Sequence, residues 1–339
     1  MARLSIPLSV LDLANVPRGG TSAQALQGTT RLAQTADLLG YHRFWVAEHH
    51  NMPIVASTSP TVLMAHLAAV TENIHVGSGG IMLPNHPSLV VAEQVAILEA
   101  LHPGRIDVGI GRAPGTDQRT AAALRRDAGQ LAAEEFPQHL IDLMGLLGDV
   151  REGSRLHSAF AATPAATSRP EILLLGSSGY SAQLAGVLGL PFVQAHHFDM
   201  GGTSESLRMY RERFDPVGDL AEPYPIVTAN AVVAEDEETA RRNALPGQLF
   251  RLWLRTGRPI ELLSVEEALE HPDRETAESI PTQALIGDPD MVADGMVALA
   301  ESTGAAELMV TATVSEYEDR IAGLELLADA VGLSASSAV

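Results

Sequence analysis

The stretch that decides the fold is Arg43-Phe44-Trp45-Val46-Ala47-Glu48-His49-His50-Asn51, where an apolar run ends in a carboxylate and two adjacent imidazoles. Aromatic and β-branched residues favour a strand, so we predict one over residues 43–50. A strand whose last residues change from apolar to ionisable carries polar groups from a rigid core to the edge of a sheet. We therefore expect the chemistry of this protein at the end of this strand.

Seven further apolar runs repeat this pattern, and each of the eight is followed by at least one predicted helix. Apolar runs without strict alternation are typical of parallel strands buried on both faces. Eight strand and helix units predict a (β/α)8 TIM barrel, and an open doubly wound sheet is the competing fold. The predicted strands cover residues 4–14, 43–50, 74–83, 105–112, 171–175, 192–197, 225–233 and 307–314. The predicted helices cover 22–39, 60–70, 89–101, 117–147, 180–188, 204–214, 235–255, 288–302 and 316–331.

Two long stretches interrupt this rhythm. Residues from about 148 to 169 are rich in Ala, Thr, Ser and Pro, and residues from about 256 to 282 carry many charges with little periodicity. We interpret both as irregular insertions in a single barrel domain of residues 1–334, and we expect them to form the walls of a substrate pocket. Residues 335–339 are predicted to be a disordered tail.

Composition excludes several classes of function. The 339 residues include 42 acidic and 22 basic ones, for a net charge of −20, which repels nucleic acid and anionic membranes. All the basic residues are arginine and cysteine is absent, so Schiff-base lysines, disulfides and thiolate metal sites are excluded. The chain shows no signal peptide and no apolar segment long enough to span a membrane, so we expect a soluble cytoplasmic protein that binds a small neutral ligand or an anion.

A phosphate site is predicted where two neighbouring strands end. Gly176-Ser177-Ser178-Gly179 precedes a helix, so hydroxyl and backbone N–H groups meet at the positive end of a helix dipole. Arg112 ends the strand before it and offers a bidentate cation. The alternative is that Ser177 and Ser178 only cap the helix and that Arg112 pairs with a nearby acid.

Glycines mark the end of the third strand. Ser78-Gly79-Gly80 lies within a predicted strand, where glycine indicates either a bulge or a ligand close to the backbone. A flat ring system is one hypothesis for the space beside these glycines. A bulge that helps to close the barrel is the other.

The paired histidines are not expected to bind a metal. Adjacent residues of a strand point to opposite faces, so His49 and His50 do not address one ion, and no metal-binding spacing such as H-E-x-x-H occurs. One of them is expected to face the barrel mouth as a hydrogen-bond or acid–base group. The alternative is a histidine whose partners are all local. The same argument applies, with less support, to His196 and His197.

Four segments together resemble the bacterial luciferase-like flavin monooxygenases. They are residues 44–50 (FWVAEHH), 76–87 (VGSGGIMLPNHP), 93–99 with Glu93-Gln94 and Leu98-Glu99, and 103–112 (PGRIDVGIGR). The resemblance covers nearly the whole chain and is strongest over residues 9–126 and 173–197. Within the family the chain is most similar to actinobacterial enzymes that tailor aromatic polyketides, of the mensacarcin type.

The resemblance implies a TIM-type barrel that receives reduced FMN (FMNH2) from a separate NAD(P)H-dependent flavin reductase. The flavin then reacts with O2 to a C4a-hydroperoxide, which hydroxylates or epoxidises a small organic substrate. It also implies a homodimer formed through residues 60–70 and 89–101. By position, the resemblance assigns FMN phosphate binding to Arg112, Ser178 and Ser181, with Ser177 beside them. It also implies that the Gly79-Gly80 bond is a non-proline cis peptide beneath the flavin, and that His49 serves the oxygenation chemistry.

One departure from the luciferases stands next to the phosphate-binding arginine. A reactive cysteine precedes that arginine in luciferases, and Gly111 takes its place here, which puts a long-lived, light-emitting intermediate in doubt. Two other functions remain open within the same fold. One is an oxidoreductase that transfers hydride with the deazaflavin F420, and the other is a catalytically silent flavin-binding protein.

Overall fold

The structure is a computed structural model that describes residues 4–125, 135–165, 168–198 and 201–333. The predicted tail at residues 335–339 lies outside the described residues. So does the middle of the helix predicted over residues 117–147, of which two separate helices on either side are described.

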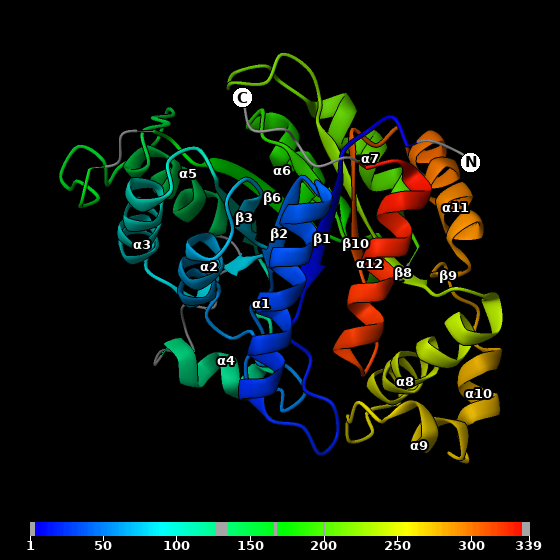
Figure 1. The fold of residues 1–339 in the computed structure, drawn as a ribbon. Coiled ribbons are helices and arrows are strands. Elements are labelled where there is room, and N and C mark those ends of the chain that lie inside the picture. Colours follow the sequence, from blue (N-terminus) through cyan, green and yellow to red (C-terminus); the bar gives the residue numbers. More distant parts are fainter. Residues whose placement is uncertain (1–3, 126–134, 166–167, 199–200, 334–339) are drawn as a thin grey trace.

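Eight parallel strands close into a barrel, as predicted (Figure 1). The last of them, β10, pairs with both β8 and β1, and this closure excludes the open sheet. The eight are β1 (Leu8–Asp12), β2 (Arg43–Val46), β3 (His75–Ser78), β5 (Ile106–Gly111), β6 (Glu171–Gly176), β7 (Phe192–Gln194), β8 (Pro225–Val233) and β10 (Glu307–Thr311). Two short strands were not predicted as separate elements: β4 (Ile81–Met82) pairs with β5, and β9 (Leu285–Gly287) extends the end of β8.

Helices surround the barrel. They are α1 (Ser22–Leu39), α2 (Pro60–Ala69), α3 (Ser88–Leu101), α4 (Gln118–Arg125), α5 (Phe136–Leu146), α6 (Gly179–Val187), α7 (Thr203–Arg213), α8 (Glu237–Thr256), α9 (Val265–Leu269), α10 (Arg274–Ser279), α11 (Pro289–Thr303) and α12 (Tyr317–Val331). The ends of α1 follow from sequence: Thr21 and Gln24 form a capping box, and Gly40 at φ 82° ends the helix. None of the described helices is both long and apolar enough to cross a membrane.

The interior of the barrel is packed around Trp45. Its indole lies among Leu11, Leu173, Val193, Ile226 and Met309, which come from five other strands. This ring needs glycines on the neighbouring strands, because a Cβ on Gly77 would lie 2.3 Å from Nε1 of Trp45. The indole N–H donates to Asp107 at 2.9 Å.

Buried charges fill the end of the barrel where the strands begin. Arg43, the first residue of β2, lies 2.6 Å from Glu171 and 3.1 Å from Glu307, which begin β6 and β10, and 2.9 Å from Asp107. Arg43, Glu307 and Asp107 are almost completely buried. Because this network occupies the amino-terminal end, only the carboxyl ends of the strands remain for a functional site.

The two insertions lie at different ends of the barrel. Residues 148–165 connect α5 to the start of β6, so they return to the amino-terminal end, where Arg151 donates to the carbonyl of Val217. The expectation that this segment lines a pocket at the mouth is therefore wrong. The second insertion contacts the loop after β1, where the N–H of Arg18 donates to the carbonyl of Leu262.

The second insertion is also more regular than predicted. It contains the helices α9 and α10, which pack on the end of α8 around a small hydrophobic core that includes Trp253, Leu263 and Ala277. In Figure 1 these three helices lie together below the barrel, at the same end as α4. Each of α9 and α10 buries only a few residues against α8. Such short helices leave no extended apolar period in the sequence, which is why they were not predicted.

Candidate active site

The polar residues after β2 are organised by Glu48. The strand ends at Val46, earlier than predicted, and residues 47–50 follow without regular structure. The carboxylate of Glu48 is completely buried and accepts hydrogen bonds from the N–H of Met82, Nδ2 of Asn85, and Nε2 of both His86 and His50, all at 2.9–3.0 Å. Burial raises the pKa of Glu48, but the interactions with His86, His50 and Asn85 outweigh it and hold the pKa below its ordinary value.

The side chains of His49 and His50 have different hydrogen-bond partners. These partners, rather than the alternation of residues along a strand, give the two rings different directions. His50 is turned to Glu48, whereas Nδ1 of His49 lies 3.3 Å from the carbonyl oxygen of Gly115. A carbonyl accepts only, so Nδ1 of His49 carries the proton and Nε2 is the basic nitrogen of the neutral ring. Burial lowers the pKa of His49 from its ordinary value, which keeps the imidazole available as a base.

His196 and His197 lie in a 3-10 helix, His196–Phe198, just after β7 rather than in the predicted strand. Nδ1 of His197 contacts Oγ1 of Thr228 at 2.5 Å, and Nδ1 of His196 contacts Oγ1 of Thr203 at 2.9 Å. Burial lowers the pKa of His197 to about 4, with further lowering by the nearby charges of His196 and His49. His49 and His197 thus both follow carboxyl ends of barrel strands, β2 and β7.

The predicted phosphate residues converge at the start of α6. The guanidinium carbon of Arg112 lies 4.2 Å from the ring centroid of Tyr180, in the first turn of that helix. Ser178 is the N-cap residue, yet its side chain makes no capping hydrogen bond, and Ser177 is exposed whereas Ser181 is buried. Among the described residues, no carboxylate lies within ion-pair distance of Arg112. The structure therefore does not contain the alternative arrangement, in which Ser177 and Ser178 only cap the helix and Arg112 forms an ion pair with a nearby acid.

The glycines after β3 have a packing role. The Gly79–Gly80 peptide bond is cis, as the family resemblance implies. A Cβ on Gly79 would lie 2.5 Å from Cδ1 of Leu11, and one on Gly80 would lie 2.8 Å from the Gly109 carbonyl oxygen. Glycine is therefore needed at these two positions because the side chain of Leu11 and the carbonyl group of Gly109 occupy the space that a Cβ atom would take. Ser78 is buried, and its hydroxyl donates to the same carbonyl at 2.9 Å.

Three residues of this region were not predicted as site residues. Asn85 and His86 bind Glu48, and Tyr180 lies against Arg112. Asn85 and His86 stand in the VGSGGIMLPNHP segment, but neither continues a periodic pattern. Only the contact with a carboxylate almost forty positions earlier gives them a role.

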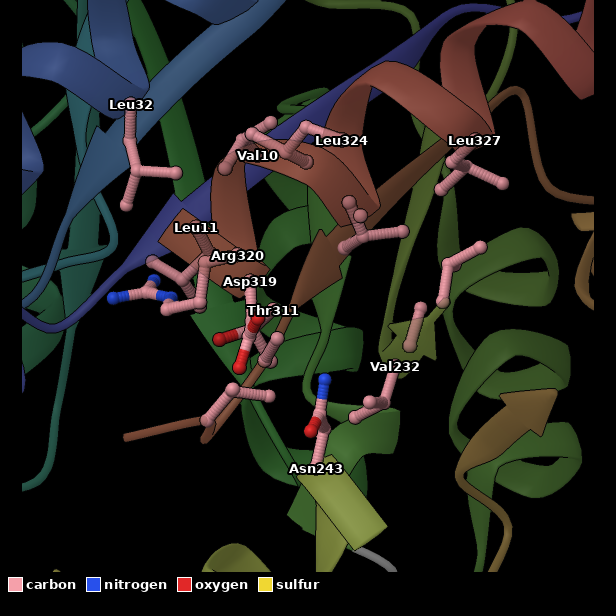
Figure 2. A pocket seen from close by; sticks show the side chains of 16 residues that line it. Val10, Leu11, Leu32, Val232, Asn243, Thr311, Asp319, Arg320, Leu324 and Leu327 are labelled. Atoms are coloured by element: carbon pink, nitrogen blue, oxygen red, sulfur yellow. The ribbon is translucent and has the colours of Figure 1, made fainter. Parts of the chain in front are cut away.

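The cavity in Figure 2 lies outside the barrel wall and is separate from this site. It has a volume of about 40 Å³ and lies between β1, β8 and β10 on one side and α8 and α12 on the other. Aliphatic side chains such as Val10 and Leu327 form most of its wall, with Asn243, Asp319 and Arg320 as polar members. A space of this size holds a few water molecules at most.

Within residues 4–125, 135–165, 168–198 and 201–333, no three His, Asp or Glu side chains are grouped so that they could hold a metal ion.

Residues 6–307 match the family model described as luciferase-like monooxygenase. The chain is 42% identical to the uncharacterised protein YvbT of Bacillus subtilis over 95% of this chain and 96% of that protein. It is 34% identical to the N-acetyl-S-alkylcysteine monooxygenase of the same organism, over 96% and 98%. Among solved structures, apo-MsnO8 superimposes with a TM-score of 0.89 at 36% identity, over 97% and 99% of the two chains.

Two more distant structures share the fold alone. The oxygenating constituent of 3,6-diketocamphane monooxygenase from Pseudomonas putida, solved in complex with FMN, has a TM-score of 0.73 at 18% identity over 97% of this chain and 98% of that one. An F420-dependent secondary alcohol dehydrogenase has a TM-score of 0.66 at 13% identity, over 97% and 99%.

Proposed function

We propose that this chain, which belongs to the luciferase-like monooxygenase family, is a cytoplasmic flavin-dependent enzyme that uses reduced FMN and O2 to hydroxylate or epoxidise a small organic substrate. A separate NAD(P)H-dependent reductase would supply the reduced flavin. One relative, the trigonelline monooxygenase of Acinetobacter baylyi, is described as an oxygenase component, which supports a two-component arrangement.

The observation that carries the proposal concerns the ionic surroundings of Arg112. Its guanidinium is not neutralised by a carboxylate within the described part of the chain, although the protein carries 42 acidic residues, and it lies against the first turn of α6. The hydroxyl of Ser178 at the N-cap is not used for capping. A cation, a hydroxyl and the positive end of a helix dipole fit a phosphate dianion, so we assign the FMN phosphate to Arg112, Ser178 and Ser181, with Ser177 beside them.

The flavin ring is assigned to the mouth between β2 and β3. There it would rest against the Gly79–Gly80 peptide with His49 beside it, and when bound it supplies the chemistry that activates O2. The protein's own contribution is that Nε2 of His49 accepts or returns a proton at the substrate. The apolar barrel interior beneath the mouth, including Leu11, Leu175 and Met309, excludes water from this space.

A homodimer is proposed through α2 and α3. Most residues of these two helices are apolar, although the helices lie on the outside of the barrel. Val62 on α2 is 70% exposed, and Ile97 and Leu101 on α3 are 47% and 65% exposed. Ile97 and Leu101 are four positions apart and so share one helix face. A second copy of the chain that covers this face would bury all three.

The phosphate assignment is tested by comparing FMN with riboflavin, which lacks the phosphate. Fluorescence titration of the wild-type protein should show tighter binding of FMN, in both redox states. Arg112→Ala should weaken FMN binding by about 10- to 100-fold and leave riboflavin binding unchanged, because only the phosphate loses a charge-assisted partner. Arg213→Ala, an exposed arginine at the end of α7, is the matched control and should bind like wild type.

Each alternative function predicts a different result in the same assay. Tight binding of F420 without binding of FMN would identify a deazaflavin oxidoreductase. FMN binding without oxygen consumption above that of free reduced flavin, for every substrate tried, would identify a silent flavin-binding protein. Unchanged FMN affinity in Arg112→Ala would refute the assignment of this arginine.

A further inference from the structure

His197 is held over the barrel mouth by two successive interior residues of β8. Ile226 belongs to the cluster inside the barrel, so Thr228 and Asn230, two and four residues further along the strand, face the same interior. Oγ1 of Thr228 contacts Nδ1 of His197, and Nδ2 of Asn230 donates to the His197 carbonyl oxygen at 2.8 Å. The imidazole is therefore fixed at the mouth from both its ring and its backbone.

The partner of Thr228 decides which nitrogen of His197 carries the proton. The Thr228 hydroxyl donates its only hydrogen to the carbonyl oxygen of Gln194 at 3.0 Å. Its oxygen can then only accept from Nδ1 of His197, so Nδ1 is protonated and Nε2 keeps its lone pair. Since burial lowers the pKa of His197 to about 4, the ring is neutral at neutral pH.

The mouth thus contains two neutral imidazoles with the same orientation of donor and acceptor. His49 donates from Nδ1 to Gly115, and His197 donates from Nδ1 to Thr228. No group in the described ranges hydrogen-bonds to Nε2 of either ring. Beneath them the barrel interior is apolar, with Leu11, Val193 and Met309 packed around Trp45. A ligand that complements these groups has an apolar body, which contacts the barrel interior, and an O–H or N–H group that donates to Nε2.

We propose that His197 is a specificity residue whose Nε2 accepts a hydrogen bond from a hydroxyl group of the substrate, and that Thr228 positions it by fixing its tautomer. The proposal rests on the proposed function, because it names the class of substrate for the same site: an apolar molecule that carries an alcohol, phenol or enol O–H. His49 remains the residue assigned to the proton chemistry.

The tautomer is tested by NMR on protein labelled with 15N in its histidines, at neutral pH and without added ligand. The His197 signals are identified by their loss in His197→Phe. We expect a neutral ring protonated at Nδ1, and we expect Thr228→Val to abolish this preference, since valine keeps the shape but not the acceptor. Thr203→Val, which removes the hydrogen bond between Thr203 and His196, is the matched control and should leave the His197 signals unchanged. A ring protonated at Nε2, or a charged ring, would overturn the proposal.

The hydroxyl preference is tested with phenol and anisole, which share a ring and differ in the O–H donor. Phenol should bind about tenfold more tightly than anisole and shift the Nε2 resonance of His197, and His197→Phe should lose this difference. Equal affinities, or no detectable phenol binding, would refute the proposal. The titration is run with and without FMN: a phenol preference without FMN binding would retain this proposal and refute the flavin assignment, and the reverse result would do the opposite.

Discussion

Nε2 of His86 lies 2.9 Å from one oxygen and 3.0 Å from the other oxygen of the Glu48 carboxylate, which no solvent reaches. The same carboxylate binds the backbone of Met82 and the side chain of His50. It therefore joins the segment after β2 to the segment after β3. His49 is the next residue along the chain, so its position depends on a carboxylate that is not itself part of the proposed chemistry.

Replacement of Glu48 should therefore affect stability and site geometry together. Glu48→Gln presents an amide N–H₂ to groups that already donate, so we expect a loss of about 2 kcal/mol or more in the free energy of unfolding, measured with urea. Glu301→Gln, on the exposed surface of α11, is the control and should change little. Wild-type stability of Glu48→Gln would show that the charge of this carboxylate and its hydrogen bonds contribute nothing net.

His49→Ala should separate binding from chemistry. Because the phosphate assignment rests on Arg112, FMN affinity should stay within about twofold of wild type, while oxygenation of any substrate that the wild-type protein accepts should fall by about 10²- to 10⁴-fold. His157→Ala, in the insertion at the other end of the barrel, serves as the control. A variant that lacks His49 and still forms product at the wild-type rate would remove this residue from the mechanism.

Charge on the exposed apolar faces of α2 and α3 should prevent self-association. In sedimentation experiments we expect wild-type protein at twice the chain mass and the double variant Val62→Asp, Ile97→Asp at the chain mass, because a dimer would have to bury both carboxylates. Val187→Asp changes a residue of α6 that is 52% exposed, and it should remain dimeric. A wild-type monomer would refute the proposed interface.

Stability should fall on acidification, partly through His42. Burial lowers the pKa of His42 to about 4, with a smaller contribution from Arg43. Unfolding returns this pKa to about 6.5, so the unfolded chain binds more protons between these values and stability is lost as pH decreases. From pH 7 to pH 5, His42→Asn should lose roughly 1–2 kcal/mol less than wild type in urea denaturation. Equal losses would mean that His42 titrates alike in both states.

Much of the fold follows from local sequence. Apolar runs such as Phe44-Trp45-Val46 predict buried parallel strands, and caps such as Thr21 and Gly40 set helix ends, because these signals arise between residues close in the chain. Strand ends were less accurate: His49 and His197 both lie beyond the strands assigned to them. Hydrogen bonds to Gly115 and Thr228 turn these residues out of the strand direction, and no local pattern contains such partners.

By itself, the sequence determined that the chain forms eight strand and helix units and that ionisable side chains follow several of the strands. Only the tertiary structure decided what those side chains meet. It joined Glu48 to His86 by a hydrogen bond and left Arg112 against Tyr180 without an acidic partner in the described residues. It also directed the hydroxyl of Ser78 to the Gly109 carbonyl and the ring of His197 to Thr228. The physical reason is that closing a barrel joins residues far apart in sequence, and the hydrogen bonds formed there fix the direction and protonation of each side chain.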